Sequence, residues 1–229
     1  MSFVSKCANY SECFVLKNKL LQPLLKMYND FLLKQKISND NFCLNKDINT
    51  GLSSEFIIPN NNVKYYLFIT KKSNLESTKD KYNILYFFPD NNNINKNNIN
   101  KNNINENNIN ENLLSDFYLE IDENFKQDYL FEGYLYKNSD NKLFFLITDV
   151  LIINNDVIVG DYDIRLTVIN EIFINLNLCD LNNYMTINIH HVFKKENENL
   201  IKIFKNNFIF KSDICCIELI NNFEKTRYI

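Results

Sequence analysis

The segment from Tyr129 to Phe173 constrains the fold most, because it combines two apolar runs, two polar turns and a helical pattern in close succession. Apolar strands flank a polar turn at residues 138–141, and a second turn follows at residues 154–156. An amphipathic helix that contains Arg165 is predicted to begin near Ile164. A hairpin that leads into a helix must bury one face of each element, so the sequence predicts a mixed α+β domain.

Further strands are predicted on both sides of this unit from alternating or β-branched patterns. They are expected near residues 63–70, 82–88, 117–121, 186–193 and 214–220. A second helix is predicted over residues 196–205. Because most of these strands follow one another closely, we expect mixed, mainly antiparallel sheets with flanking helices.

The first 49 residues are predicted to form an N-terminal helical segment, and residues 50–229 a single domain. The helical segment has an apolar stripe made of Leu20, Leu21, Leu24, Leu25, Tyr28, Phe31 and Leu32. Pro23 interrupts this stripe and either starts a second helix or kinks a single long one. Such a stripe favours packing against the body of the protein, with a partner-binding helix as the alternative.

Residues 92–111 consist of four copies of a five-residue unit, NNINK twice and NNINE twice. A period of five matches neither a helix nor a strand, and the units contain too few apolar groups to offset chain entropy. We therefore predict a disordered Asn-rich insertion at residues 90–112, within a loop between two strands. A self-association tract is the alternative interpretation.

Composition excludes several classes of function. The formal net charge is -3, and the two arginines are Arg165 and Arg227, which argues against coating a nucleic-acid backbone but not against a compact nucleotide pocket. None of the six cysteines forms a C-x-x-C pair, so zinc is not expected. No metal site and no cofactor are predicted. The sequence indicates no membrane span and no signal peptide, and reduced thiols in cytoplasm or nucleus are expected.

The hairpin unit contains Glu132-Gly133 on one strand, Asp149 on the next and Arg165 on the helix. In this layout it resembles the middle of the mRNA guanylyltransferase and DNA ligase fold, which snurportin cap-binding domains share. The resemblance implies a nucleotidyltransferase-like fold. It leaves open whether the chain is an enzyme or a binder.

The enzymes of this fold attach a nucleotide to the lysine of a K-x-D-G motif. The chain contains no Asp-Gly pair, and no lysine stands at residues 59–62, where the motif is expected. The family's D-G-L-I-F strand would fall at residues 213–217, without its glycine, and few residues follow for the last lysine pair. We therefore predict that the protein is not an enzyme. A divergent or truncated guanylyltransferase or ligase, or a scaffold without nucleotide binding, remains the alternative.

Short patterns between about residues 50 and 228 are similar to snurportin. Ser54-Glu55-Phe56 resembles an S-E-W segment, Lys64 stands before YYLFIT as in a G-K-R strand, and Thr78-Lys79 opens a T-K-x-G-Y-like turn. The resemblance implies cap contacts from Ser54, Phe56, Lys64 and Lys79. An aromatic ring would stack on the methylated purine, worth about 1–3 kcal/mol, and lysines would neutralise the triphosphate.

The resemblance thus implies non-catalytic binding of the 5′ trimethylguanosine cap of small nuclear RNA. It further implies a part in nuclear import with an importin-type transport factor, and so a location in cytoplasm and nucleus. Two departures stand out, because the chain has no tryptophan and its N-terminal segment has no Arg-rich helix. His190 and His191 are predicted to face opposite ways, which argues against joint metal binding. Asp161 and Asp163 share a face if extended, and a metal there is a weak hypothesis.

Overall fold

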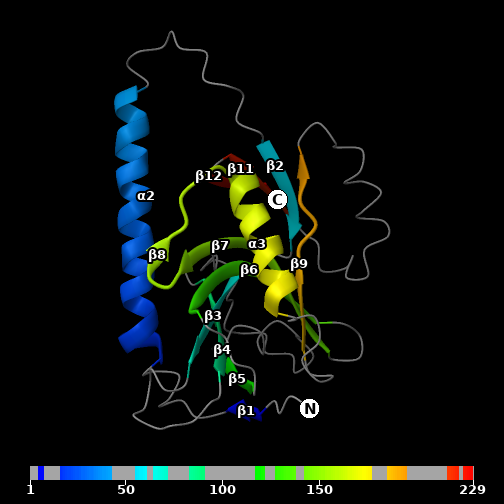
Figure 1. Cartoon of the computed structure of the whole chain (residues 1–229). Coiled ribbons are helices and arrows are strands. Elements are labelled where there is room, and N and C mark those ends of the chain that lie inside the picture. The colour runs from blue at the N-terminus through cyan, green and yellow to red at the C-terminus, as the bar shows by residue number, and fades with distance from the viewer. Residues whose placement is uncertain are drawn as a thin grey trace, which may run out of the picture.

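The computed structural model describes the chain in eleven ranges, residues 5–7, 16–42, 55–60, 64–71, 83–90, 117–121, 127–137, 142–176, 185–194, 216–221 and 224–228. Within these ranges two α-helices accompany two β-sheets (Figure 1). The predicted α+β class is confirmed. No helix in the described ranges combines the length and apolar character needed to cross a bilayer.

The larger sheet has eight strands and is antiparallel except at one pair. Its spatial order is β1 (Ser5–Cys7), β5 (Phe117–Ile121), β4 (Asn83–Pro89), β3 (Lys64–Lys71), β6 (Tyr129–Lys137), β7 (Leu143–Ile153) and β8 (Asp156–Val157). The eighth strand, β9 (Met185–Ile189), pairs in parallel with β7. A two-residue turn joins β7 to β8, and both of its residues, Asn154 and Asn155, have positive φ, as the tight hairpin requires.

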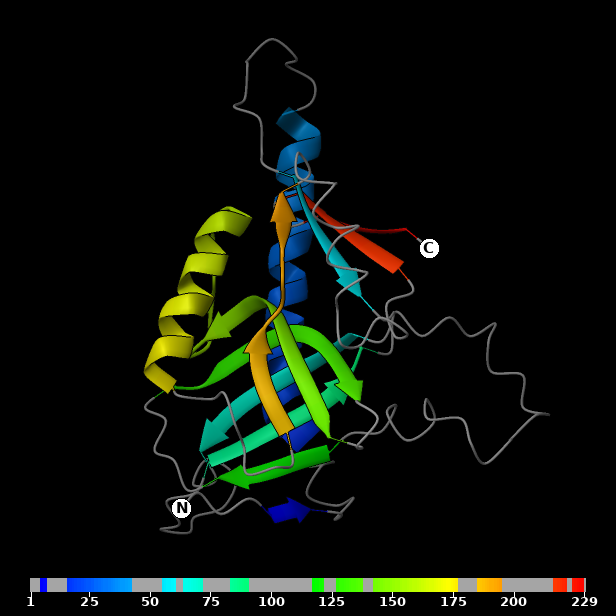
Figure 2. The same cartoon turned by 90° about the vertical axis from the view of Figure 1, so that its right-hand side faces the viewer.

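The smaller sheet is antiparallel, in the order β10 (Phe193–Lys194), β2 (Glu55–Asn60), β11 (Cys216–Asn221) and β12 (Glu224–Tyr228). The chain passes from one sheet to the other between β9 and β10, the orange segment of Figure 2. Ile58 and Ile220 of the smaller sheet pack against Tyr134 and Tyr136 of β6. This shared core holds the two sheets together.

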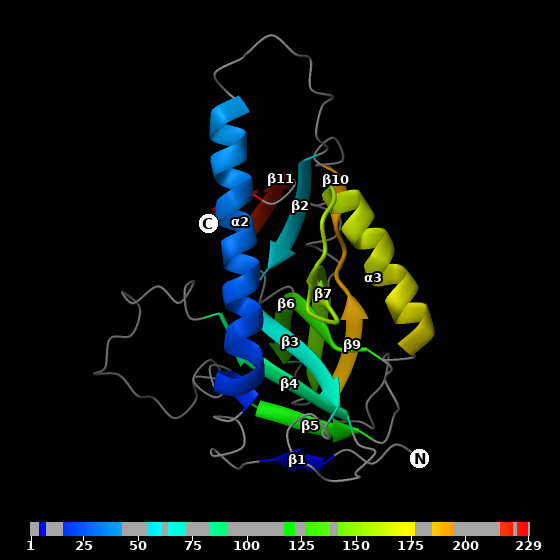
Figure 3. The ribbon, with the colours of Figure 1, turned by 60° about the vertical axis from the view of Figure 1, so that its left-hand side comes forward.

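Helices cover both faces of the larger sheet (Figure 3). Helix α2 (Gln22–Phe42) follows a short π-helical turn, η1 (Leu16–Leu21), and Pro23 lies in its first turn, where a missing N–H costs nothing. Leu21, Leu24 and Tyr28 pack on one face of the sheet. Helix α3 (Tyr162–Leu176) packs on the other face. The N-terminal helix α2 is therefore not a separate unit, because its apolar side chains belong to the core on its own face of the sheet.

Most predicted strands are present within one or two residues, and the helix predicted near Ile164 is α3. The continuous strand predicted at residues 186–193 is wrong, because the chain changes sheets there and forms β9 and β10. Strand β2 was not predicted. The turn at residues 138–141, the helix at residues 196–205 and the Asn-rich repeats lie outside the described residues.

The pairing of β6 with β7 is irregular where Gly133 lies. The register shifts between Leu130 and Phe131 and again between Glu132 and Gly133, so β7 has an extra residue at each point. Bulges of this kind bend a strand and re-aim its side chains. A Cβ atom on Gly133 would lie 2.3 Å from the backbone oxygen of Leu146, so only glycine fits.

We predict that Gly133→Ala lowers the free energy of unfolding by about 1–3 kcal/mol, because the added methyl group meets rigid backbone. Urea denaturation followed by circular dichroism measures the change. Val159→Ala, at a side chain that is 61% exposed, is the control and should stay within about 0.5 kcal/mol of the unmodified protein. An alanine variant as stable as the unmodified protein would contradict the close approach.

Candidate functional site

A buried network of charged side chains lies on the α2 face of the larger sheet, where the smaller sheet meets it. Its carboxylates are Glu132 of β6 and Asp149 of β7. Its cations are Lys64 of β3, Arg165 of α3 and Lys225 of β12. Four strands from the two sheets and helix α3 therefore converge on one cluster. The bulges beside Glu132 and Asp149 turn these neighbouring strand residues toward it.

Arg165 and Asp149 form the most buried pair of the network. The Nε atom of Arg165 lies 2.8 Å from Oδ1 of Asp149, and Nη2 lies 3.2 Å from Oδ2, which gives a two-point contact. Nη1 donates to the carbonyl oxygen of Gly160 at 2.8 Å, and the guanidinium lies over the ring of Tyr162. The exposed fractions of the two charged side chains are 1% and 0%. The pair fixes the start of α3 against β7.

Glu132 receives two lysines on one oxygen atom. The Nζ of Lys64 lies 3.0 Å from Oε1, and the Nζ of Lys225 lies 2.6 Å from the same atom. Lys225 also donates to Oδ2 of Asp149 at 2.9 Å. Lys225 therefore bridges the two carboxylates and links β12 of the smaller sheet to the larger one.

The network controls the charge state of its members. Burial by itself would raise the pKa of Glu132, but the charges and hydrogen bonds of Lys225 and Lys64 outweigh it and lower the pKa from 4.5 to about 2. Burial would lower the pKa of Arg165, but Asp149 outweighs this effect and raises it. Both groups are therefore charged across the physiological pH range.

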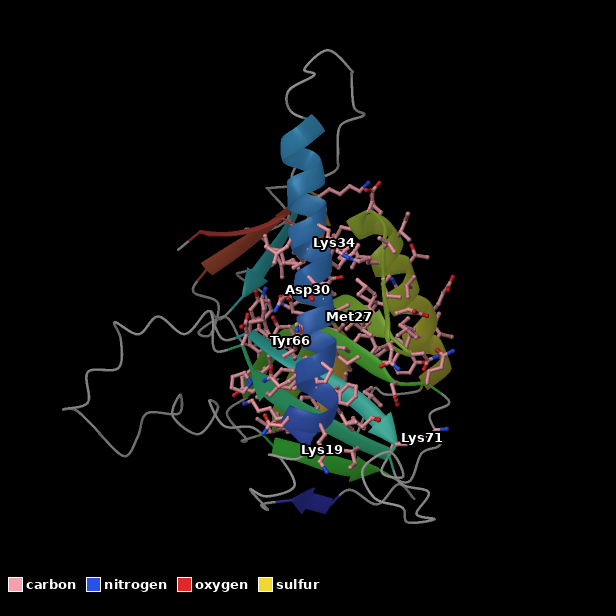
Figure 4. All side chains as sticks on the ribbon, turned by 90° about the vertical axis from the view of Figure 1, so that its left-hand side faces the viewer. Lys19, Met27, Asp30, Lys34, Tyr66 and Lys71 are labelled. Carbon is pink, nitrogen blue, oxygen red and sulfur yellow. The ribbon has the colours of Figure 1, made fainter. Side chains whose placement is uncertain are left out.

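A pocket of about 750 Å³ lies next to the network, between α2 and the ends of β3 and β4. This volume is within the usual range for small-molecule sites. Its walls carry lysines, aromatic rings and one acid, among them Lys17, Lys26, Tyr28, Tyr66, Phe88 and Asp90. The rings of Tyr66 and Phe88 stack with centroids 5.1 Å apart, and Figure 4 shows Tyr66 beside α2. The pocket thus combines a planar aromatic wall with groups of both charges.

Two tyrosines join the pocket to the network. Tyr66 stands directly opposite Glu132 in the pairing of β3 with β6. Burial raises the pKa of Tyr66 well above its usual range, and the charges of Glu132 and Asp90 add to this effect. Burial likewise raises the pKa of Tyr28, which the charge of Lys225 partly opposes. Both phenols therefore stay neutral, and the hydroxyl of Tyr66 donates to Oδ2 of Asp90 at 3.3 Å.

The structure brings together four residues that the sequence analysis singled out, namely Lys64, Glu132, Asp149 and Arg165. Of the predicted cap contacts, Ser54 and Lys79 lie outside the described residues. Phe56 lies in β2, and its side chain is not among those described. Lys64 is described, and it is buried in the network.

Sequence reasoning missed Lys225 and the pocket residues Tyr28, Tyr66 and Asp90. Lys225 follows the last predicted strand, where we expected little room for a functional lysine. The three pocket residues come from segments far apart in sequence, so no motif connects them. Asp90 was assigned to the start of the insertion, although its position directly after an apolar strand is a signal that could have marked it.

His190 and His191 lie between β9 and β10 rather than on one strand, and they differ in exposure. His190 is buried, with Nε2 3.2 Å from the hydroxyl of Tyr136, whereas His191 is exposed. Asp161 and Asp163 are both exposed at the start of α3. In the described part of the chain, no group of three or more His, Cys, Asp or Glu side chains is placed to hold a metal ion.

No protein-family model matches the chain, and no curated protein matches its sequence. The chemistry of the site therefore rests on its own residues and their arrangement.

We predict that the low pKa of Glu132 makes stability depend on pH in acid. A carboxyl group whose pKa falls on folding stabilises the protein above its ordinary pKa, and this contribution is lost as the pH falls from about 4.5 toward 2. The shift corresponds to about 3 kcal/mol. Urea midpoints between pH 7 and pH 2.5 should show this loss in the unmodified protein but not in Glu132→Gln.

The exposed Glu171 of α3 provides the control for this measurement, since Glu171→Gln should follow the pH dependence of the unmodified protein. Parallel curves for the unmodified protein and Glu132→Gln would contradict the assignment.

We also predict that Asp149→Asn costs about 3–5 kcal/mol of stability, because it leaves the buried guanidinium of Arg165 without its counter-charge. Thermal and urea unfolding measure the loss. Asp156→Asn changes an exposed acid in the neighbouring strand β8 and should change stability by less than about 0.5 kcal/mol. Equal effects of the two substitutions would show that the network does not support the fold.

Proposed function

We propose that the protein has a nucleotidyltransferase-like fold and binds the 5′ guanosine cap of an RNA without catalysing a reaction. The trimethylguanosine cap of small nuclear RNA is the form that the resemblance to snurportin implies. The observation that carries the proposal is the pocket between α2 and the larger sheet, which places lysines, stacked aromatic rings and a buried acid around one space.

The arrangement of the sheets supports the proposed fold. Two mainly antiparallel sheets meet at the network, and helices cover both faces of the larger sheet. Glu132, Asp149 and Arg165, which the resemblance selected, are neighbours in space although Asp149 is 16 positions before Arg165 and lies on a different element. Such convergence is expected if the layout is shared.

The pocket chemistry suits a cap. A methylated, cationic purine gains energy on an aromatic ring, and the half-buried Tyr66, which stacks on Phe88 beneath it, provides that ring at the pocket wall. The triphosphate bridge requires cations, and Lys17 and Lys26 provide point charges at the rim. In this proposal Lys64 contributes through the network, because it fixes Glu132, the cross-strand neighbour of Tyr66.

A nucleotidyltransferase is the second candidate, and one observation favours it. Lys64 and Lys225 share a single oxygen atom of Glu132, so each amine lies beside another cation, one arrangement in which lysines act as nucleophiles. In that case the Lys64 ammonium would first give one proton to the carboxylate of Glu132, and the resulting amine would attack the α-phosphate of GTP or ATP. A phosphoramidate bond would form, and pyrophosphate would leave.

The partners follow from the proposed ligand. Capped small nuclear RNA is the binding partner, and an importin-type transport factor would carry the complex from cytoplasm to nucleus. Helix α2 packs into the core through Leu24 and Tyr28, next to Leu21 of η1. A transport factor would therefore have to bind another surface.

Isothermal titration with trimethylguanosine cap analogue, 7-methylguanosine cap analogue and GTP tests the proposal. We expect at least one cap analogue to bind, and the double variant Lys17→Ala/Lys26→Ala to weaken it about tenfold through loss of phosphate contacts. Lys19→Ala/Lys34→Ala is the matched control, because both lysines are exposed on the same helical segment (Figure 4) and neither lines the pocket.

Phe56→Ala and Lys79→Ala, titrated in the same way, test the contacts implied by the resemblance. Incubation with radiolabelled GTP or ATP and magnesium tests the second candidate. A covalent adduct that Lys64→Ala abolishes would replace the binding proposal by the enzymatic one. Absence of binding by every cap analogue would overturn the proposal.

A further inference from the structure

We propose that the exposed face of η1 and α2 binds the RNA chain that follows the cap, through contacts of Lys19 and Lys34 with its phosphates. The identity of this partner rests on the proposed cap-binding function. The surface itself is separate from the pocket, because neither lysine lines it. It provides affinity for the body of a capped RNA, which a free cap nucleotide lacks.

Positive charge is concentrated on the N-terminal helical segment. Residues 16–42, which comprise η1 and α2, contain five lysines and two aspartates and so carry a formal charge of +3. The whole chain carries -3, so the remaining residues together carry -6. Such an asymmetry attracts a polyanion to one side of an otherwise acidic protein.

The lysines of this segment lie on its outer surface. Lys19, Lys26 and Lys34 are all exposed, and Figure 4 shows Lys19 and Lys34 at different heights along the helical segment, with Asp30 between them. Asp30 is four residues from Lys26 and four from Lys34, so it can offset part of their charge. One carboxylate cannot neutralise three ammonium groups, and the face stays positive.

The other side of the larger sheet has the opposite charge. Helix α3 covers that side, and its exposed charged residues are Asp163 and Glu171, with Asp161 exposed just before it. The cation of this helix, Arg165, is buried against Asp149. An RNA chain is therefore repelled from the α3 side and attracted to the α2 side.

The basic face continues directly from the pocket. Lys26 lines the pocket, where the proposed function places the triphosphate bridge of the cap. Lys34 follows Lys26 by eight residues, about 12 Å along a helix, and Lys19 precedes Lys26 by seven. A strand that rises about 3.4 Å per nucleotide covers about 12 Å in roughly four nucleotides. The first nucleotides after the cap therefore reach one of the two lysines in either direction along the helix.

The cap makes these surface contacts effective. A single exposed lysine contributes little by itself, because water and salt screen its charge. A bound cap tethers the RNA chain beside Lys19 and Lys34 at a high effective concentration, so weak phosphate contacts add to the affinity of the cap. The basic face therefore strengthens the binding of capped RNA and gives only weak binding of uncapped RNA.

An anionic membrane surface fits this face less well than RNA does. A helix that lies on a membrane inserts an apolar face into the lipid. The apolar face of α2 is used in the core, where Leu24 and Tyr28 are buried. Only its polar side is left for a partner, and the phosphates of an RNA chain require no apolar contact.

Fluorescence anisotropy with a capped decanucleotide RNA, labelled at its 3′ end, tests the inference. Competition by the cap analogue gives the affinity of the cap alone. We expect the capped RNA to bind about tenfold tighter than the analogue, and Lys19→Ala/Lys34→Ala to remove most of this gain, because the analogue has no chain to reach these lysines. The slope of log Kd against log salt concentration should fall by about 0.7 for each lysine that contacts a phosphate.

Two further variants at exposed positions make the test specific. Asp30→Asn removes the acid of the same face, so capped RNA should bind about two- to threefold tighter while the affinity for the analogue is unchanged. Lys194→Ala removes an exposed lysine of β10 in the smaller sheet, and it should leave the affinity for capped RNA unchanged. Circular dichroism checks that each variant is folded.

The outcomes separate this inference from the proposed function. If no cap analogue binds, the proposed function fails and the inference fails with it. If the analogue binds but capped RNA binds no tighter, or Lys19→Ala/Lys34→Ala keeps the gain, only the inference is overturned. If capped RNA shows no gain and vesicles that contain phosphatidylserine bind the unmodified protein but not the double variant, the partner is a membrane surface, which also overturns the inference.

Discussion

The carboxylate of Asp149 is the contact on which the arrangement of this protein depends. It is fully buried, and it receives Arg165 from α3 and Lys225 from the smaller sheet. A buried charge is tolerated only when it is paired, so each of these groups requires the others to stay in place. One carboxylate thereby fixes the start of a helix, the approach of two sheets and, through Lys225, the position of Glu132.

The pocket lies next to this network, and two of its tyrosines contact or face members of the network, although none of the ion pairs of the network lines the pocket. Tyr66 faces Glu132 across the strands, and the hydroxyl of Tyr28 lies in the field of Lys225. The same helix, α2, places Tyr28 in the core and Lys26 at the pocket rim. The side chains that line the pocket therefore lie on elements that are already packed in the core. This packing reduces the conformational entropy that the protein loses when a ligand binds.

The sequence predicted local structure better than long-range arrangement. Periodicity located β3, β4 and α3 because their patterns are long and apolar, and it also located the short strand β5. Strand β2 was missed because Pro59 and Asn60 are typical of turns, and residues 186–193 were taken as one strand because periodicity does not reveal a change of sheet. Glu132, Asp149 and Arg165 were noticed through a shared layout, whereas Lys225 and Asp90 join the site only through folding.

The separation of Lys225 from its partners along the chain has a consequence for synthesis. Lys225 follows Glu132 by 93 positions. At ribosomal rates this gap corresponds to roughly 5–20 s. During that interval the larger sheet can pair its strands, but the two carboxylates lack the lysine that bridges them. A nascent chain of this protein therefore passes through a stage in which Glu132 and Asp149 have been made but the lysine that bridges them has not.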